Sequence, residues 1–322
     1  FWSEDPRQTI IQTIGALNLT LIAMWYARVF GWDSYIRVTV VPLVLVTAAG
    51  AFWQFLGPGR SLQAARFEGI TPAFNHQGFV CSTAIVLLLI YQLRNRGSSI
   101  AVTGIVLALF VALFATGGRS NMTVCLVAAF VAFYPRIRPS YRLPVTFGAL
   151  LIGAAGATVA GNIGLYSRRS ENVLNGRDII WSHALELIAD SPLIGHGMMS
   201  GEAVWNAAAN SGAVAINANS AHNIFLEVAI GTGLIGLLLF FGSLGQMIWT
   251  SVRSRSAAIL APLILLLGVG VNESMVHRPN LALWLLGGVV ALSVSAYEDG
   301  SDSADPGVEI MPVFGGRRHP IN

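Results

Sequence analysis

Residues 175–236 carry the most informative pattern in the chain. The stretch opens with NGRDIIWSHALELIADSPLIGHG (175–197), continues through small and polar residues, and closes with SAHNIFLEVAIGTGLIG (220–236). The first motif repeats apolar residues at helical spacing, and Pro192 predicts its end. We therefore predict an amphipathic helix here, lying either at a membrane surface or against a neighbouring loop.

The second motif begins with His222 and Asn223, where a long apolar run starts. Ser220 or Asn219 can cap a helix whose first turn would hold both residues. A helix N-terminus disfavours imidazolium, so we expect a neutral His222 that can act as a general base. The alternative is a polar residue that only helps to cap its own helix.

The composition is that of an integral membrane protein. Of the 322 residues, 54% are hydrophobic and 11% are charged, whereas about 25% are charged in soluble domains. We predict an all-α, polytopic helical bundle in which residues 1–297 form the transmembrane domain. Both cysteines fall within predicted spans, so neither a disulfide nor a metal site is expected. About nine spans are predicted: 9–30, 36–56, 78–93, 99–116, 120–134, 144–165, 222–246, 257–275 and 280–297.

Arginine placement predicts the orientation. All 19 basic residues are Arg, and 11 of them fall in one alternating set of loops and the tail. The side with more Arg is expected to be cytoplasmic. This makes 166–221 a large exoplasmic loop and 298–322 a disordered cytoplasmic tail.

Several exoplasmic residues are candidates for a site. Arg60, Arg66, Arg119 and Arg177 lie in three loops that can converge, and Arg side chains suit phosphate and pyrophosphate. The alternative is ordinary ion pairing with acidic side chains or headgroups. Glu273, near the outer end of the eighth span, is either functional or simply interfacial. Three glycines after the His-Asn pair are expected to form a packing face: Gly231, Gly233 and Gly236.

Four motifs, in this order, resemble the O-antigen ligase and polymerase superfamily. They are RFEGITPAFNHQGF (66–79), TGGRSNM (116–122), the 175–197 motif and AHNIFLEVAIGTGLIG (221–236). The most specific feature is the His-Asn pair followed, after nine residues, by Gly233 and then Gly236. The resemblance covers about 60–245.

The resemblance implies a membrane glycosyltransferase at the outer face of the bacterial inner membrane. Its donor would be a glycan on undecaprenyl pyrophosphate, its acceptor a hydroxyl of a glycan or lipid, and it would need no metal or other cofactor. His222 resembles the family's proposed base, and Arg119 and Arg177 resemble the arginines that hold the pyrophosphate. Arg66 resembles another family arginine, and Asn223 adjoins the base. Membrane lipids are expected partners, and nucleic acid is not.

Two departures and two rivals remain open. The family has about twelve spans, so further N-terminal spans are expected ahead of the first residue, Phe1. The segment 198–218 matches no pattern, so the acceptor stays undefined. A polymerase would use a second lipid-linked glycan as acceptor. A transporter for an anionic lipid would show helices interrupted near the middle of the membrane and inverted repeats, neither of which is visible. Three further candidate site residues are Arg60, His183 and Glu227, with the last two as replacement bases.

Overall fold

A computed structural model of the chain describes twelve stretches, and every regular element in them is a helix. The all-helical prediction is therefore confirmed for the described part. The described residues are 6–56, 67–71, 74–95, 99–146, 148, 177–197, 201–210, 212, 220–254, 256–271, 273 and 280–302.

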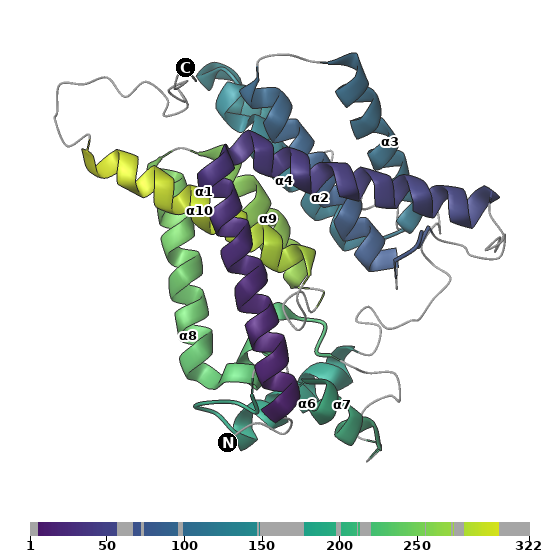
Figure 1. The fold of residues 1–322 in the computed structure, drawn as a ribbon, viewed down its shortest axis with the longest axis vertical. Coiled ribbons are helices and arrows are strands. Elements are labelled where there is room, and N and C mark those ends of the chain that lie inside the picture. Colours follow the sequence, from purple (N-terminus) through teal and green to yellow (C-terminus); the bar gives the residue numbers. More distant parts are fainter. Residues whose placement is uncertain are drawn as a thin grey trace.

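The first helix packs mainly against the last, and the helices between them form the rest of the bundle (Figure 1). A short further helix covers 139–146. The labelled elements are α1 (Pro6–Ala51) with a π-helix η1 (Phe52–Leu56), α2 (Phe74–Arg94), α3 (Ile100–Thr116), α4 (Arg119–Phe133) with a 3₁₀-helix η2 (Tyr134–Arg136), α6 (Arg177–Asp190), α7 (Gly201–Asn210), α8 (Ile224–Arg253), α9 (Ala257–Gly270) and α10 (Leu281–Asp302).

Among the described residues, three helical segments are long and apolar enough to cross a membrane, and three shorter apolar helices accompany them. This supports a multi-pass membrane protein, while the count of nine spans and the side of the large loop stay predictions. Most of the predicted span 144–165 lies outside the described residues, as does most of the predicted tail, although α10 continues to Asp302. The long segments are Thr9–Gln54, Asn75–Arg94 and Ile224–Arg253.

A single glycine divides α1 into two helices. Gly31 has φ 77° and ψ 166°, a backbone conformation that is essentially restricted to glycine. The chain turns sharply there, and the two arms of α1 diverge (Figure 1). The break falls between the predicted spans 9–30 and 36–56. These two predicted spans therefore correspond to the two arms of α1.

The first and last helices are joined by a stack of aromatic rings. Tyr35 stacks between Trp32 and Trp284, with centroid distances of 4.8 and 5.4 Å. The Tyr35 hydroxyl donates to the Trp284 carbonyl oxygen at 2.6 Å, and the Trp284 indole donates to Thr39 Oγ1 at 2.7 Å. Because the hydroxyl of Tyr35 and the indole of Trp284 both have partners, the contact between α1 and α10 combines ring stacking with hydrogen bonds.

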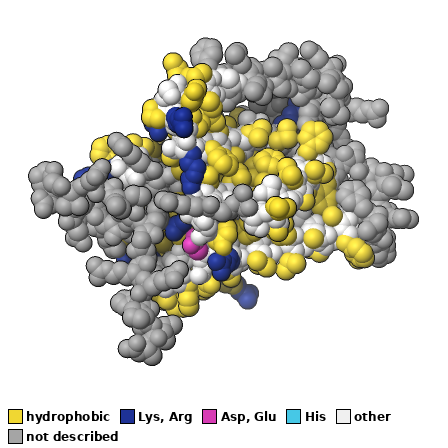
Figure 2. Space-filling view, turned by 90° about the horizontal axis from the view of Figure 1, so that it is seen from above, with side chains coloured by type: hydrophobic (Ala, Val, Ile, Leu, Met, Phe, Trp, Pro, Cys, Tyr) yellow, Lys and Arg dark blue, Asp and Glu magenta, His cyan; other side chains and the backbone are white. Residues whose placement is uncertain are grey.

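Burial separates a central helix from peripheral ones. In its most apolar window, 67% of α2 is buried, compared with 33% for α1 and 28% for α8. Most side chains of α8 that face outward are aliphatic or aromatic, as expected for a surface covered by lipid. Seen from above, hydrophobic side chains cover a broad area and Arg side chains gather beside it (Figure 2).

Candidate functional site

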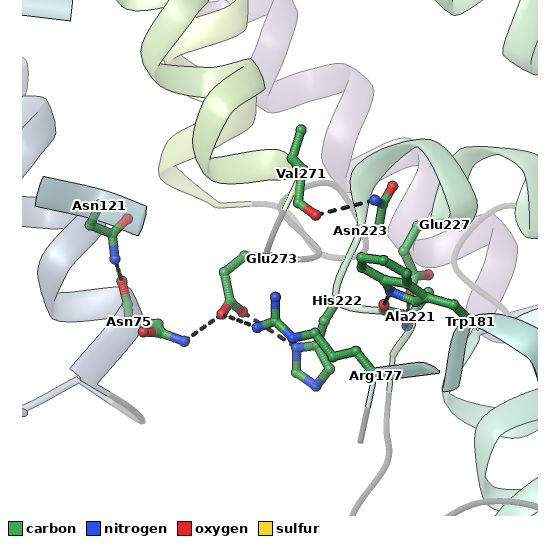
Figure 3. Close-up of polar contacts among 10 residues, drawn as sticks. All are labelled: Asn75, Asn121, Arg177, Trp181, Ala221, His222, Asn223, Glu227, Val271 and Glu273. Atoms are coloured by element: carbon green, nitrogen blue, oxygen red, sulfur yellow. Dashed lines mark hydrogen bonds and ion pairs between the residues drawn. The ribbon is translucent and has the colours of Figure 1, made fainter. Parts of the chain in front are cut away.

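Three side chains from distant parts of the chain meet the carboxylate of Glu273 (Figure 3). Nδ1 of His222 lies 3.4 Å from Glu273 Oε2, and Nη2 of Arg177 lies 3.5 Å from Oε1. Asn75 donates a hydrogen bond from Nδ2 to the same Oε1. The Glu273 side chain is only 14% exposed, compared with 33% for His222, so the carboxylate is enclosed and the imidazole is accessible.

Each member of this Glu273 cluster stands at the end of a helix. Asn75 is in the first turn of α2, Arg177 is the first residue of α6, His222 precedes α8, and Glu273 follows α9. The sequence assigns all four ends to the same side of the membrane. The cluster therefore arises from the way the helices pack and not from any one segment.

The start of α8 differs from the prediction. Asn223 is the N-cap, and its Oδ1 accepts hydrogen bonds from the backbone N–H groups of Phe225 and Leu226. Its Nδ2 donates to the Val271 carbonyl oxygen at 3.1 Å, which ties α8 to the end of α9. The prediction that His222 lies in the first turn is wrong, because it precedes the cap with a left-handed φ of 49°. The helix N-terminus therefore gives no reason to expect a neutral His222 imidazole. The charged neighbour of this ring is Glu273.

Ala221, next to the imidazole, is held on both sides. Its N–H donates to Oε1 of Glu227, and its carbonyl oxygen accepts from Nε1 of Trp181 at 3.0 Å. Glu227 is buried, so its carboxylate orients this turn and is not presented to a substrate. Trp181 faces the turn too, which favours the interpretation of α6 as a helix packed on a loop.

The glycines of the second motif do more than form a packing face. Gly233 breaks α8 with φ 66° and ψ −168°, and the carbonyl group of Leu193 occupies the space that a Cβ would fill. Gly195 also approaches α8 closely, since its Cβ would lie 2.5 Å from the Ile230 carbonyl oxygen. Four backbone hydrogen bonds join the two segments: His196 N–H to Ile230 O, Gly197 N–H to Gly231 O, Leu234 N–H to Pro192 O and Ile235 N–H to Leu193 O. We call residues 191–197 docked on this break the docked loop.

Two of the arginine-bearing loops converge. The Phe67 N–H donates to the Ala115 carbonyl oxygen at 2.8 Å, and Phe67 is buried. Phe67 directly follows Arg66, and Ala115 precedes Arg119, the first residue of α4, by four positions. The backbone next to Arg66 is thus anchored beside the turn that leads to Arg119.

Gln54 in the π-helix η1 supplies the anchor. Its Oε1 accepts from the backbone N–H groups of Glu68 and Gly69, at 3.0 and 2.9 Å. The backbone of Gly50 lies against Gly69 so closely that a Cβ on Gly50 would be 2.8 Å from the Gly69 Cα. The π-helix carries the Gln54 side-chain amide that contacts the loop. This agrees with the association of π-bulges with functional sites.

The remaining predicted residues are placed as follows. Arg60 and Arg66 lie outside the described residues. Arg119 is exposed at the α4 N-terminus, and whether it shares one anion with Arg177 stays a prediction. His183 pairs with Glu186 at 3.0 Å and has an edge contact with Trp205, and no described contact joins it to the Glu273 cluster.

Sequence reasoning missed the asparagines that connect the loops. Asn121 is 2% exposed, and its Nδ2 donates to the Asn75 carbonyl oxygen at 3.0 Å, so α4 is tied to the residue that binds Glu273. The available signal for both residues was an asparagine in the first turn of a helix that is otherwise mostly apolar. Among the described residues, no three His, Cys, Asp or Glu side chains gather as metal ligands would.

The fold and the site together describe a helical membrane protein with a polar cluster where the ends of four helices meet. A family model described as O-antigen ligase matches residues 104–241. This confirms the resemblance to the O-antigen ligase and polymerase superfamily. The match covers less than half of the chain and includes Arg119, Arg177 and His222, whereas Asn75 and Glu273 lie outside it. No curated protein matches the chain.

Proposed function

We propose that the protein is a membrane glycosyltransferase of the O-antigen ligase type. It transfers a glycan from undecaprenyl pyrophosphate to an acceptor hydroxyl at the outer face of the bacterial inner membrane. The observation that supports this most is the Glu273 cluster, which combines a partly exposed imidazole, a carboxylate and a guanidinium within hydrogen-bond or ion-pair distance. The family match supports the class of reaction.

His222 is the proposed general base. An ionised carboxylate can only accept a hydrogen bond, so its contact with Nδ1 favours the tautomer that carries the proton there. Nε2 is then the unprotonated nitrogen. Glu273 orients the ring and stabilises the imidazolium that forms, as the carboxylate does in other carboxylate–histidine pairs.

Arg177 is the proposed pyrophosphate ligand nearest the base. Its guanidinium contacts Glu273 through Nη2, and a guanidinium has five N–H donors in all. Arg119 and Arg66 belong to the two loops that meet at Phe67 and Ala115. Charge that grows on the leaving pyrophosphate is stabilised by such fixed donors, and losing one typically costs about 10²–10³ in rate.

The reaction proceeds in one displacement. Nε2 of His222 takes the proton of the acceptor hydroxyl, and that oxygen forms a bond to the anomeric carbon. The bond from this carbon to the pyrophosphate oxygen breaks, and its electron pair leaves with undecaprenyl pyrophosphate. Attack from the face opposite the leaving group inverts the anomeric configuration, and the proton on His222 then passes to solvent.

Interrupted helices, which are typical of transporters, occur in this protein, because α1 and α8 are broken at Gly31 and Gly233. The sequence predicted no interruption near the middle of the membrane. Transporters place such breaks near the middle of the membrane, around the substrate. Here Gly233 has 20 helical residues after it and Gly31 has 25 before it, enough in each case to cross a bilayer of about 30 Å. Both breaks therefore suit membrane boundaries, which favours the transferase.

The test is reconstitution of the purified protein in liposomes with a defined undecaprenyl-pyrophosphate-linked glycan. We expect undecaprenyl pyrophosphate to be released in equal amount to the glycan transferred. Two acceptors are supplied in separate reactions, a lipid-anchored oligosaccharide and a second molecule of the donor. Transfer to the first identifies a ligase, transfer to the second a polymerase. Movement of intact donor across the bilayer without transfer to either acceptor would refute the proposal.

A further inference from the structure

The docked loop holds two apolar side chains outward. Leu193 is 61% exposed and Ile194 is 52% exposed, although their backbone is clamped to α8. Leu234 and Ile235 adjoin them across the hydrogen bonds and are 44% and 52% exposed. A rigid backbone that exposes four aliphatic side chains together indicates a surface that is covered in the functional state.

The length of α8 after the break locates this surface. Residues 234–253 number 20, which is about 30 Å of helix and equals the usual thickness of the hydrocarbon core. Most of their outward side chains are apolar, from Leu238 to Val252, with Ser243 and Gln246 as polar exceptions, and the stretch ends at Arg253. If this stretch crosses the bilayer, Gly233 lies at the hydrocarbon boundary on the side of the Glu273 cluster. In Figure 1 the part of α8 before the break turns aside from the long part.

We propose that Leu193, Ile194, Leu234 and Ile235 form one lipid-binding surface that enters the bilayer at this boundary and contacts acyl chains. The occupant follows from continuity, because the four side chains extend the apolar face of a helix that is itself a candidate span. The docked loop carries no Asp, Glu or Arg. Its one titratable side chain, His196, turns inward, where Nε2 lies 2.8 Å from the Leu187 carbonyl oxygen.

The surface also sets the depth of α6. His196 and Ser191 link the docked loop to the last turn of this helix, since Ser191 N–H donates to the Leu187 carbonyl oxygen and His196 contacts the same oxygen. α6 has 14 residues, about 20 Å, and Arg177 is its first. Anchoring one end in the bilayer holds the guanidinium at a constant distance from the lipid phosphates. This consequence rests on the proposed function, whereas the lipid contact does not.

The test measures membrane depth and requires no enzyme activity. Cys81 and Cys125 are replaced by Ala, and a nitroxide is attached to the variants Leu193→Cys and Ile194→Cys in liposomes. Leu238→Cys, on the outward face of α8 at 71% exposure, is the control for lipid contact. Asn206→Cys, an exposed position on α7, is the control for water. Oxygen and a water-soluble nickel chelate are then compared as relaxing agents.

We expect the labels at 193 and 194 to resemble the label at 238, with high oxygen and low nickel accessibility. Nickel accessibility like that at 206 would overturn the proposal, and so would protection from both agents, which would indicate a protein cover. Because a native cysteine replacement can perturb folding, the same labels are read in the wild-type background, where both cysteines are 0% exposed. If the labels lie in the bilayer but the protein has no transferase activity, the proposed function is refuted and the lipid-binding surface still stands.

Discussion

Two glycines break helices in the same conformation, and their surroundings differ completely. Gly31 has φ 77° and ψ 166°, and Gly233 has φ 66° and ψ −168°. A Cβ on Gly31 would meet nothing within 4 Å, whereas a Cβ on Gly233 would overlap the carbonyl group of Leu193. The first break only turns a helix. The second break also leaves space for the docked loop. This loop connects α6, which begins at Arg177, with α8, which begins after His222.

The comparison predicts that catalysis depends on the docked loop and α8, which meet at Gly233. The largest effect is expected at His222, which precedes α8. We expect His222→Asn to lower the transfer rate at saturating donor by about 10²–10⁴-fold, because the base is lost. Asn is the suitable replacement, since it tolerates the left-handed backbone at this position and can still bond to Glu273. Ala would add backbone strain to the loss of the base.

Purified protein with a defined donor provides the measurement, and unfolding midpoints show that the variant is folded. His76→Asn, an exposed histidine in the first turn of α2, is the control and should retain the wild-type rate. A near-normal rate for His222→Asn would show that His222 only shapes the turn. Neither replacement base predicted from the sequence would fit this site, because Glu227 is buried and no described contact joins His183 to the Glu273 cluster.

Gly233→Ala tests the second break directly. The substitution combines a glycine-only conformation with an overlap against the Leu193 backbone, so we expect the docked junction to lose about 3 kcal/mol. Hydrogen exchange should reveal this as lost protection at the backbone N–H groups of His196 and Gly197, which donate to α8. Unchanged protection at those two amides would contradict the docking.

Glu273→Gln tests the cluster at the end of α8 that precedes the second break. The amide keeps the shape and one acceptor oxygen, and it loses the charge that stabilises the imidazolium and pairs with Arg177. We expect kcat to fall about 10- to 100-fold, the usual cost of removing a group that orients a functional histidine. Glu68→Gln, an exposed carboxylate in a described loop, is the control. Equal effects of the two substitutions would show that only net charge matters.

Gly50→Ala moves the anchored arginine loop. A Cβ would lie 2.8 Å from the Gly69 Cα, so the loop must shift, which costs about 1–2 kcal/mol after the gain in helix propensity. We expect a higher KM for the donor, up to about tenfold, with a smaller change in kcat. Gly104→Ala is the matched control, because nothing lies within 4 Å of its Cβ in α3. A donor KM that is unchanged in both variants would separate this loop from donor binding.

Gly31→Ala should have the smallest effect. It introduces backbone strain without overlap, for a net loss of about 1 kcal/mol in stability. The transfer rate per folded molecule should stay at the wild-type value, as measured by unfolding and activity on the same sample. A loss of rate comparable to that of Gly233→Ala would show that the first break also shapes the site.

Composition and periodicity were enough to predict a helical membrane protein, because the apolar content of each segment depends only on its own residues. The motifs also singled out His222 and Arg177, which both contact Glu273 in the structure, and the family match confirms the resemblance to the superfamily. Local reasoning placed the end of α6 correctly, since Pro192 follows Asp190 by two residues.

The way in which these residues meet depends on tertiary packing. The sequence left Glu273 with two interpretations, and its partners lie 51 and 96 positions away at His222 and Arg177. The break at Gly233 was also invisible, because an apolar run with glycines is compatible with a continuous helix until another backbone occupies the space beside it. Contacts between distant helix ends have no periodicity, so packing must be known before a polar residue at such an end can be assigned a partner.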